Sequence, residues 1–270
     1  MKILLLIPIF CFAVSCNVLL DTDTSASGAT GDCEELEGAP VNILLIGNSY
    51  LSQNNIPKLL KDIACSKKMK TKVYAITEHN YRFLDHDQSE DTSFLIKNKK
   101  WDFVILQNHG QVPSWNEEQL RNESLPHAIS LANKIYDNHS ESQIIYMQTW
   151  ARKDGDQANC ELTPLVCDFT GHTQALEAGY QIYADETNAK VALVGNAFEL
   201  IYKSENSPIP FNDLWLEDGA HASYIGSYLA AAILYAKITN SSPVGAMSAA
   251  GVTKVQTFYL QSVAAQIAGP

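Results

Sequence analysis

Short runs of consecutive apolar residues recur along the chain, with amphipathic stretches between them. The runs lie at residues 41–46, 72–77, 102–107, 143–149 and 190–195. They lack the apolar-polar alternation of a strand with one wet face, which is typical of strands buried on both faces. Helices are predicted at residues 55–66, 91–98, 117–137, 173–188, 196–204, 223–238 and 252–267. This β-α alternation predicts a parallel sheet with right-handed crossovers and helices on both faces.

The first apolar run leads directly into Gly47-Asn48-Ser49, and a predicted helix follows at 55–66. Ligands of open parallel sheets bind beyond the carboxyl ends of the strands. A serine at that point can turn its own N–H toward a developing oxyanion, but its hydroxyl is a poor nucleophile unless a base removes the proton. Taken alone, Gly-Asn is ordinary turn chemistry and Ser a common helix cap, so these residues by themselves favour a structural turn.

A candidate base lies near the other end of the chain. Asp218 and His221 are three residues apart, just before the predicted helix at 223–238. In a loop, this spacing lets a carboxylate accept a hydrogen bond from one imidazole nitrogen and leaves the other free to take a proton from Ser49. The alternative is an Asp-Gly turn followed by a surface histidine. Because the spacing allows both hydrogen bonds of the histidine, we expect Ser49, Asp218 and His221 to form a catalytic triad.

These motifs resemble those of the SGNH (GDSL-like) hydrolase superfamily. The stretches "ILLIGNSYLSQNNIP", "WDFVILQNHGQVPS", "YMQTWA" and "DGAHASYIGSYLAAAILYAKITNSSP" look like an exported, mostly uncharacterised bacterial subgroup with Gly-Asn-Ser at the nucleophile. The resemblance covers residues 41 to about 243. It implies a three-layer α/β/α, flavodoxin-like fold with a parallel five-stranded sheet, in a hydrolase domain over residues 41–270. It also implies ester hydrolysis through an acyl-enzyme, and a carbohydrate O-acetyl ester is a candidate substrate.

The resemblance further implies an oxyanion hole with three donors. They would be the N–H of Ser49, a backbone N–H after the second strand and a side-chain amide after the third. Asn80 stands where the family has a glycine, and Asn tolerates positive φ better than other side chains. In the third block, Gln107 is the first choice for the amide and Asn108 the second; each has the alternative role of a turn amide.

Two further side chains are candidates for substrate contact. Trp150 follows the run at 143–149 and is a candidate pocket wall, although a packing role is the alternative. His109 is a candidate contact beside Asn108, although a loop histidine is more often solvated. Residues 151–172 have no clear period and are predicted to form a long loop that shapes the substrate site.

The N-terminus has the pattern of an export signal. In "MKILLLIPIFCFAVSC" one lysine precedes an apolar stretch that is short for a membrane span, and small residues then lead to Cys16. This ending resembles a bacterial lipoprotein signal over residues 1–16, with Cys16 lipidated; an ordinary cleaved signal is the alternative. Residues 17–40 are rich in Asp, Thr, Ser and Gly and are predicted to be a flexible tether. Either signal predicts an exported protein, held in the cell envelope (outer membrane or periplasm) or secreted.

Export permits disulfides among Cys33, Cys65, Cys160 and Cys167. Cys160 and Cys167 are the favoured pair, although four cysteines allow three connectivities. No cysteines have zinc-finger spacing with histidine, so we expect no metal, and the triad chemistry needs no cofactor.

The charge of the chain limits its partners. The formal net charge of −11 argues against a nucleic-acid surface, which needs clustered Lys and Arg. The expected partners are a small-molecule or glycan ester, and a membrane only through the N-terminal lipid anchor. The competing hypothesis is a surface lipoprotein of the same fold that binds glycans without turnover. The intact set of Ser49, Asp218 and His221 favours the exported serine esterase.

Overall fold

The computed structural model describes residue 33 and residues 35–269. The predicted signal at 1–16, its lipidation site Cys16 and most of the predicted tether lie outside the described residues. Residues 33 and 35–40 belong to the predicted tether, and the structure fastens them to the domain. Cys33 forms a disulfide with Cys65, and Lys70 Nζ donates to the carbonyl of Leu36 at 2.8 Å.

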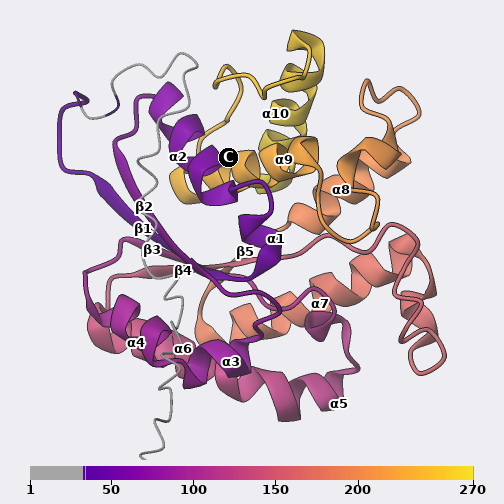
Figure 1. The fold of residues 1–270 in the computed structure, drawn as a ribbon, viewed down its shortest axis with the longest axis horizontal. Coiled ribbons are helices and arrows are strands. Elements are labelled where there is room, and N and C mark those ends of the chain that lie inside the picture. The colour runs from indigo at the N-terminus through magenta and orange to yellow at the C-terminus, as the bar shows by residue number, and fades with distance from the viewer. Residues whose placement is uncertain (1–32, 34, 270) are drawn as a thin grey trace, which may run out of the picture.

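A parallel sheet of five strands forms the centre of the molecule (Figure 1). Its strands are β1 Val41–Gly47, β2 Thr71–Thr77, β3 Phe103–Leu106, β4 Gln143–Met147 and β5 Lys190–Ala192. Their spatial order is β2-β1-β3-β4-β5, and every neighbouring pair is parallel. The predicted fold class is therefore confirmed.

Successive residues of β1 face two separate apolar cores, as alternation across a strand requires. Ile43 and Leu45 belong to one core, and Leu44 and Ile46 belong to the other. Because both faces are covered by helices, residues 43–46 of the strand are all apolar, and this accounts for the absence of alternation in the sequence.

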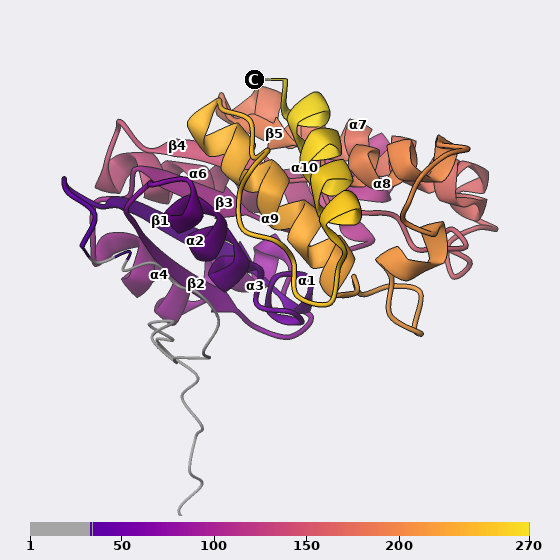
Figure 2. The same ribbon diagram turned by 90° about the horizontal axis from the view of Figure 1, so that it is seen from above.

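Helices cover both faces of the sheet, which completes the three layers (Figure 1). One layer contains α2 Ile56–Ser66, α8 Val194–Lys203, α9 Tyr224–Thr239 and α10 Lys254–Ala268. The other contains α3 Phe83–Gln88, α4 Glu90–Lys97, α6 Leu125–Asn138 and α7 Phe169–Thr187. Seen from above, α10 lies on α9, which in turn packs against α2 (Figure 2).

The predicted helix at 117–137 is interrupted in the structure. A short α5, Glu117–Gln119, passes into a π-helical turn, Leu120–Ser124, before α6 begins at Leu125. Pro126 has no N–H to donate to the preceding turn, so the regular ladder of hydrogen bonds cannot run through this point.

Other predicted boundaries also differ from the structure. The short helix α3 was not predicted, because its sequence FLDHDQ is largely polar. At the other end of the long loop, α7 begins at Phe169, where the Asp168 carboxylate caps it by accepting from the N–H of Gly171 at 2.8 Å.

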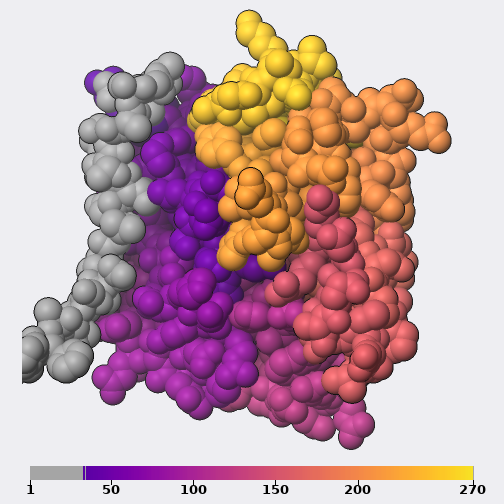
Figure 3. Space-filling model, turned by 45° about the vertical axis from the view of Figure 1, so that its right-hand side comes forward, coloured from indigo at the N-terminus to yellow at the C-terminus, as the bar shows by residue number. Residues whose placement is uncertain are grey.

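The carboxyl ends of the strands bring the candidate residues to one edge of the sheet. Ser49 follows β1, Asn80 follows β2, His109 follows β3 and Trp150 follows β4. The segment before α9 reaches the same edge. In Figure 3 that segment (orange) meets the indigo-to-magenta N-terminal half and the salmon loop that follows β4.

Candidate active site

Ser49 is the first residue of a one-turn helix, α1 Ser49–Ser52, that follows β1 without a loop. Asn48 caps this helix, with its Oδ1 accepting from the N–H of Tyr50 at 3.1 Å. The chain turns sharply because Gly47 has no side chain. A Cβ there would collide with Gln107 Oε1 and lie 2.7 Å from Leu51 Cδ1. The turn thus requires glycine and presents the Ser49 hydroxyl at the end of the strand.

The structure brings Ser49, His221 and Asp218 into one hydrogen-bonded line. His221 Nε2 lies 2.9 Å from Ser49 Oγ, and His221 Nδ1 lies 2.6 Å from Asp218 Oδ2. The other carboxylate oxygen of Asp218 accepts from the N–H groups of Ala220 and His221, each at 2.9 Å. Burial tends to raise the pKa of Asp218, but these hydrogen bonds outweigh it and hold that pKa below its usual value. Asp218 is therefore an acceptor that fixes the orientation of the ring.

The loop that carries Asp218 and His221 is fastened to the chain that follows β4. Trp150 Nε1 donates to the Ala220 carbonyl at 2.8 Å, and the N–H of Lys153 donates to the Gly219 carbonyl at 2.9 Å. The two acceptors, Gly219 and Ala220, are the residues between Asp218 and His221. The bonds therefore fix the position of the loop relative to the sheet.

Trp150 does not form a pocket wall, contrary to the sequence prediction. Its side chain is fully buried and stacks between Phe198 and Tyr50, with ring centroids 5.2 Å and 4.9 Å away. Tyr50 lies over it and is tilted against the His221 ring at 5.5 Å. Tyr50 was missed by sequence analysis, although its place directly after Ser49 was the available signal. The tryptophan thus supports the catalytic residues from below.

Two backbone N–H groups are free to receive an oxyanion. Those of Ser49 and Asn80 have no hydrogen-bond partner among the residues that the structure describes. Asn80 has a φ of 61°, the left-handed conformation in which the family's glycine would present its N–H, and it lines the cleft at this edge.

Gln107 is not available as an oxyanion donor, contrary to its prediction as first choice. Its side chain is fully buried. Its Oε1 accepts from the N–H of Asn48 at 3.0 Å, and its Nε2 donates to the carbonyl of Asn108. Because both ends of the amide are occupied, Gln107 holds the turn before Ser49 in place.

Asn108 is likewise occupied, which contradicts its prediction as second choice. Its side chain is fully buried, and each end of the amide has two partners. The partners are the N–H groups of Phe83 and His109 and the hydroxyls of Ser124 and Tyr183. The amide therefore joins the β3 loop to the helices beneath it.

His109, from the same loop after β3, lines a cleft at this edge of the sheet. A cleft of about 410 Å³ is lined by Asn80, Arg82, His109, Gln111, Val112, Trp115 and Asn159. The loop also touches the nucleophile turn, since a Cβ on Gly110 would lie 2.5 Å from the Tyr50 hydroxyl. Burial, and then the positive charges of Arg152 and Arg82, lower the pKa of His109. A neutral ring is favoured at this place.

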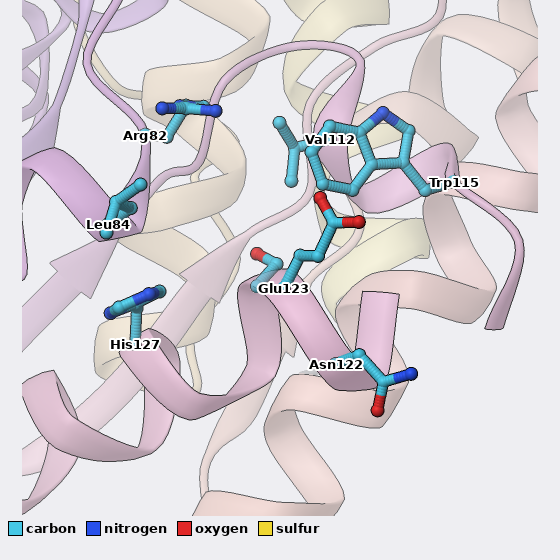
Figure 4. Close-up of a pocket in the computed structure, with 8 residues that line it drawn as sticks. Arg82, Leu84, Val112, Trp115, Asn122, Glu123 and His127 are labelled. Atoms are coloured by element: carbon cyan, nitrogen blue, oxygen red, sulfur yellow. The ribbon is translucent and has the colours of Figure 1, made fainter. Parts of the chain in front are cut away.

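A second cleft of about 280 Å³ adjoins the first along Arg82, Val112 and Trp115. Figure 4 shows Arg82 and His127 on one side of it and Trp115 and Glu123 on the other. Arg82 and Trp115 were not among the predicted site residues, although each lies in the loop that follows a predicted strand.

The loop after β4 closes one side of the first cleft, as its lack of periodicity predicts. The structure pairs Cys160 with Cys167 in this loop. Asp156 accepts from Gln111 Nε2 and from Asn159 Nδ2, each at 2.6 Å. A buried carboxylate thereby ties the disulfide loop to the β3 loop.

His86 lies directly beneath the nucleophile turn and is fully buried. Its Nε2 must carry a proton, because it bonds the carbonyl of Gly47 at 2.9 Å, and its Nδ1 then accepts from the Thr92 hydroxyl at 3.0 Å. Burial lowers the pKa of His86 to about 4. The histidine thus stays neutral and supports the turn.

Among residues 33 and 35–269, no three His, Cys, Asp or Glu side chains gather in a group that could hold a metal ion. Within the same residues, the helices are too short or too polar to cross a membrane.

Known structures resemble this arrangement. A DUF4886 family protein from Bacteroides uniformis superposes with a TM-score of 0.71 at 17% identity, covering 84% of this chain and 94% of that one. A protein assigned as an SGNH hydrolase, from Slackia heliotrinireducens, superposes with a TM-score of 0.58 at 21% identity, and the match covers 73% of this chain and 98% of that one. A protein assigned as a GDSL-like lipase, from Parabacteroides merdae, superposes with a TM-score of 0.52 at 12% identity, and the match covers 74% of this chain and 95% of that one.

The chain has the SGNH-hydrolase fold. No family model and no curated protein matches the sequence, so this likeness is one of structure. At this level of identity the likeness assigns the SGNH fold, while the chemistry has to be argued from the side chains of this chain.

Proposed function

We propose that the protein is a serine esterase that hydrolyses carboxylic esters through an acyl-enzyme. The observation that carries the proposal is the line of hydrogen bonds from Ser49 Oγ through His221 to Asp218. A serine that meets a histidine oriented by a carboxylate is the arrangement that activates a hydroxyl at neutral pH. Neighbouring solved structures assigned as hydrolases and lipases of the same fold agree with it.

The first half of the reaction forms the acyl-enzyme. Ser49 Oγ attacks the ester carbonyl carbon while His221 Nε2 takes the hydroxyl proton, and the carbonyl oxygen becomes an oxyanion. When this intermediate collapses, the bond from carbon to the alcohol oxygen breaks, and His221 gives its proton to the departing alcohol. Asp218 remains ionised throughout and stabilises the imidazolium.

The second half releases the acid. Water attacks the acyl carbon while His221 removes its proton, and the second oxyanion collapses by breaking the bond to Ser49 Oγ. His221 returns the proton to that oxygen, which regenerates the free serine.

The free N–H groups of Ser49 and Asn80 are the backbone donors proposed for the oxyanion. We assign the third donor to His109 in place of Gln107 and Asn108, whose amides are occupied. A neutral imidazole N–H is a competent donor, and the lowered pKa of His109 keeps it neutral near pH 7.

From the leader pattern we infer that this activity is exported, to the envelope or the medium, with Cys16 as the proposed lipid anchor. A carbohydrate O-acyl ester, the candidate implied by the family resemblance, is the proposed natural substrate.

Hydrolysis of p-nitrophenyl acetate by the purified domain tests the chemistry. The Ser49→Ala variant should lower kcat by about 10³-fold or more, because the nucleophile is lost. Ser52→Ala is the matched control, since Ser52 is exposed in the same helical turn. Turnover that survives in Ser49→Ala would sink the mechanism, whereas a wild-type domain that turns over no ester would leave glycan binding as the better hypothesis.

A further inference from the structure

The chain has only three arginines, Arg82, Arg121 and Arg152, and they differ in their partners. Arg121 lies on the surface between the carboxylates of Glu117 and Glu186, at 2.8 Å and 2.9 Å. Arg152 has no carboxylate within 4 Å among the described residues, and its buried Nε has no hydrogen-bond partner there. In a chain with 30 acidic and 19 basic residues, a guanidinium without an anion is unusual.

Arg152 lies beside the catalytic loop. Its backbone N–H donates to His172 Nδ1 at 3.2 Å, and the next residue, Lys153, bonds the carbonyl of Gly219. Its charge acts on the pKa values of both Tyr50, the residue after Ser49, and His109, which lines the first cleft. The unpartnered cation therefore lies between the catalytic loop and the residues around the cleft, close enough to both to act on their charges.

Arg82 supplies a second positive charge, and it lines both clefts. Asp85 Oδ2 accepts from both the backbone N–H and the Nε of Arg82, at 2.8 Å and 3.3 Å. The Nη groups make no hydrogen bond within the described chain and remain available on the wall that the two clefts share (Figure 4). His109 is influenced by both guanidinium groups.

We propose that the cleft recognises esters that carry an anionic group, a carboxylate, sulfate or phosphate, which binds between Arg152 and Arg82 beside His109. A guanidinium group offers paired donors that match such oxyanions, and burial strengthens the interaction. This inference rests on the proposed esterase function, because it names the substrate class for the same site. The charge could belong to the alcohol or to the acyl part of the ester.

Matched pairs of esters test the inference. O-acetylated glucuronic acid is compared with O-acetylated glucose for a charged alcohol, and p-nitrophenyl hydrogen succinate with p-nitrophenyl butyrate for a charged acyl group. The wild-type protein should have the higher kcat/KM for the charged member of at least one pair. Arg152→Gln should reduce that preference roughly tenfold or more, as expected for a lost charge-assisted hydrogen bond. Arg121→Gln is the control and should leave both members unchanged.

Two results would overturn the inference: equal kcat/KM values within both pairs in the wild-type protein, or an equal loss for charged and neutral esters in Arg152→Gln. The second result would assign Arg152 to support of the catalytic loop. Arg82→Gln, which removes an exposed side chain, provides the same comparison if Arg152→Gln does not fold.

Calorimetric titration of the Ser49→Ala variant with glucuronate, succinate and glucose separates this inference from the proposed function. The Ser49→Ala variant should bind glucuronate or succinate in preference to glucose, and the added Arg152→Gln substitution should abolish that preference. This result supports anion recognition even if no ester is turned over. Turnover of neutral esters without anion binding supports the esterase and rejects the anion site.

Discussion

Asn48 shows how a single side chain can fix the position of a nucleophile. Its N–H donates to Gln107, its Oδ1 accepts from Tyr50, and its Nδ2 donates to the Tyr81 carbonyl at 2.9 Å. These partners follow β3, β1 and β2, respectively. The residue before Ser49 is therefore held from three strands at once, and a preorganised nucleophile needs such support.

The proposed role of His109 leads to a prediction at the same scale. His109→Ala should lower kcat for p-nitrophenyl acetate by about 10²-fold, as the loss of one oxyanion donor does. His139→Ala is the matched control, because His139 ends α6 and lies near the amino ends of the strands. A kcat that stays at the wild-type value would assign His109 to substrate contact alone.

Residue roles could be predicted from the sequence only in part. Ser49, Asp218 and His221 were identifiable because their chemistry depends on residue type, spacing and position at strand ends. Gln107, Asn108 and Trp150 were assigned to the cleft but are fully buried. Their position in the sequence gives no direction for the side chain, and that direction depends on partners such as Tyr183 that lie far along the chain.

Among the elements, the disulfide loop after β4 shapes the cleft most directly. Cys160 and Cys167 close a small ring, Asn159 lines the cleft, and Asp156 connects the loop to Gln111 on the β3 loop. The loop depends on few apolar contacts, and Leu162 and Leu165 are exposed at 86% and 52%. Covalent closure therefore adds to the hydrogen bonds of Asp156 in restraining its conformation.

Removing this disulfide should change binding more than chemistry. The double variant Cys160→Ser/Cys167→Ser should raise KM severalfold and leave kcat nearly unchanged, because the triad does not depend on the loop. Cys33→Ser/Cys65→Ser is the control: it also removes one disulfide, but from the far edge of the sheet, so it should lower Tm without raising KM. Steady-state kinetics and thermal unfolding of both variants are the measurements. An equal KM in the two variants would contradict a role for the loop.

The sequence predicted the five strands and most helices because apolar runs and amphipathic periods are local signals. Boundaries were weaker where apolar residues continue past the end of an element. The predicted strand at 190–195 ends at Ala192, and α8 begins at Val194. The Leu193-Val194 pair extends the apolar pattern across both, so periodicity alone could not separate them.

For the molecule as a whole, buried neutral histidines predict loss of stability in mild acid. Burial lowers the pKa of both His86 and His172 from 6.5 to about 4. Between these values the unfolded chain binds protons that the folded chain excludes, so the free energy of unfolding falls as the pH falls from about 6.5 to 4. The loss is up to roughly 3 kcal/mol for each histidine. Above pH 6.5 neither histidine contributes to the pH dependence.

Urea unfolding at several pH values between 7.5 and 4.5 measures this effect. This pH range lies above the lowered pKa values of Asp85, Asp87 and Asp218, so these carboxylates contribute little to the change in stability across it. His86→Gln retains a donor for Gly47 and an acceptor for Thr92 but does not titrate, so its stability should depend less steeply on pH. A wild-type protein equally stable at pH 7.5 and 4.5 would contradict the prediction.

The Cys33–Cys65 disulfide has a mechanical consequence. Cys65 lies at the end of α2, just before β2 begins, and this is the amino edge of the sheet. The cleft lies at the carboxyl edge, on the other side of the domain. A pull on the chain before Cys33 is therefore carried by the sulfur bridge into α2 and does not reach the catalytic turn. A domain held by that end would turn its cleft outward, toward polymers in the surroundings rather than toward the surface that holds it.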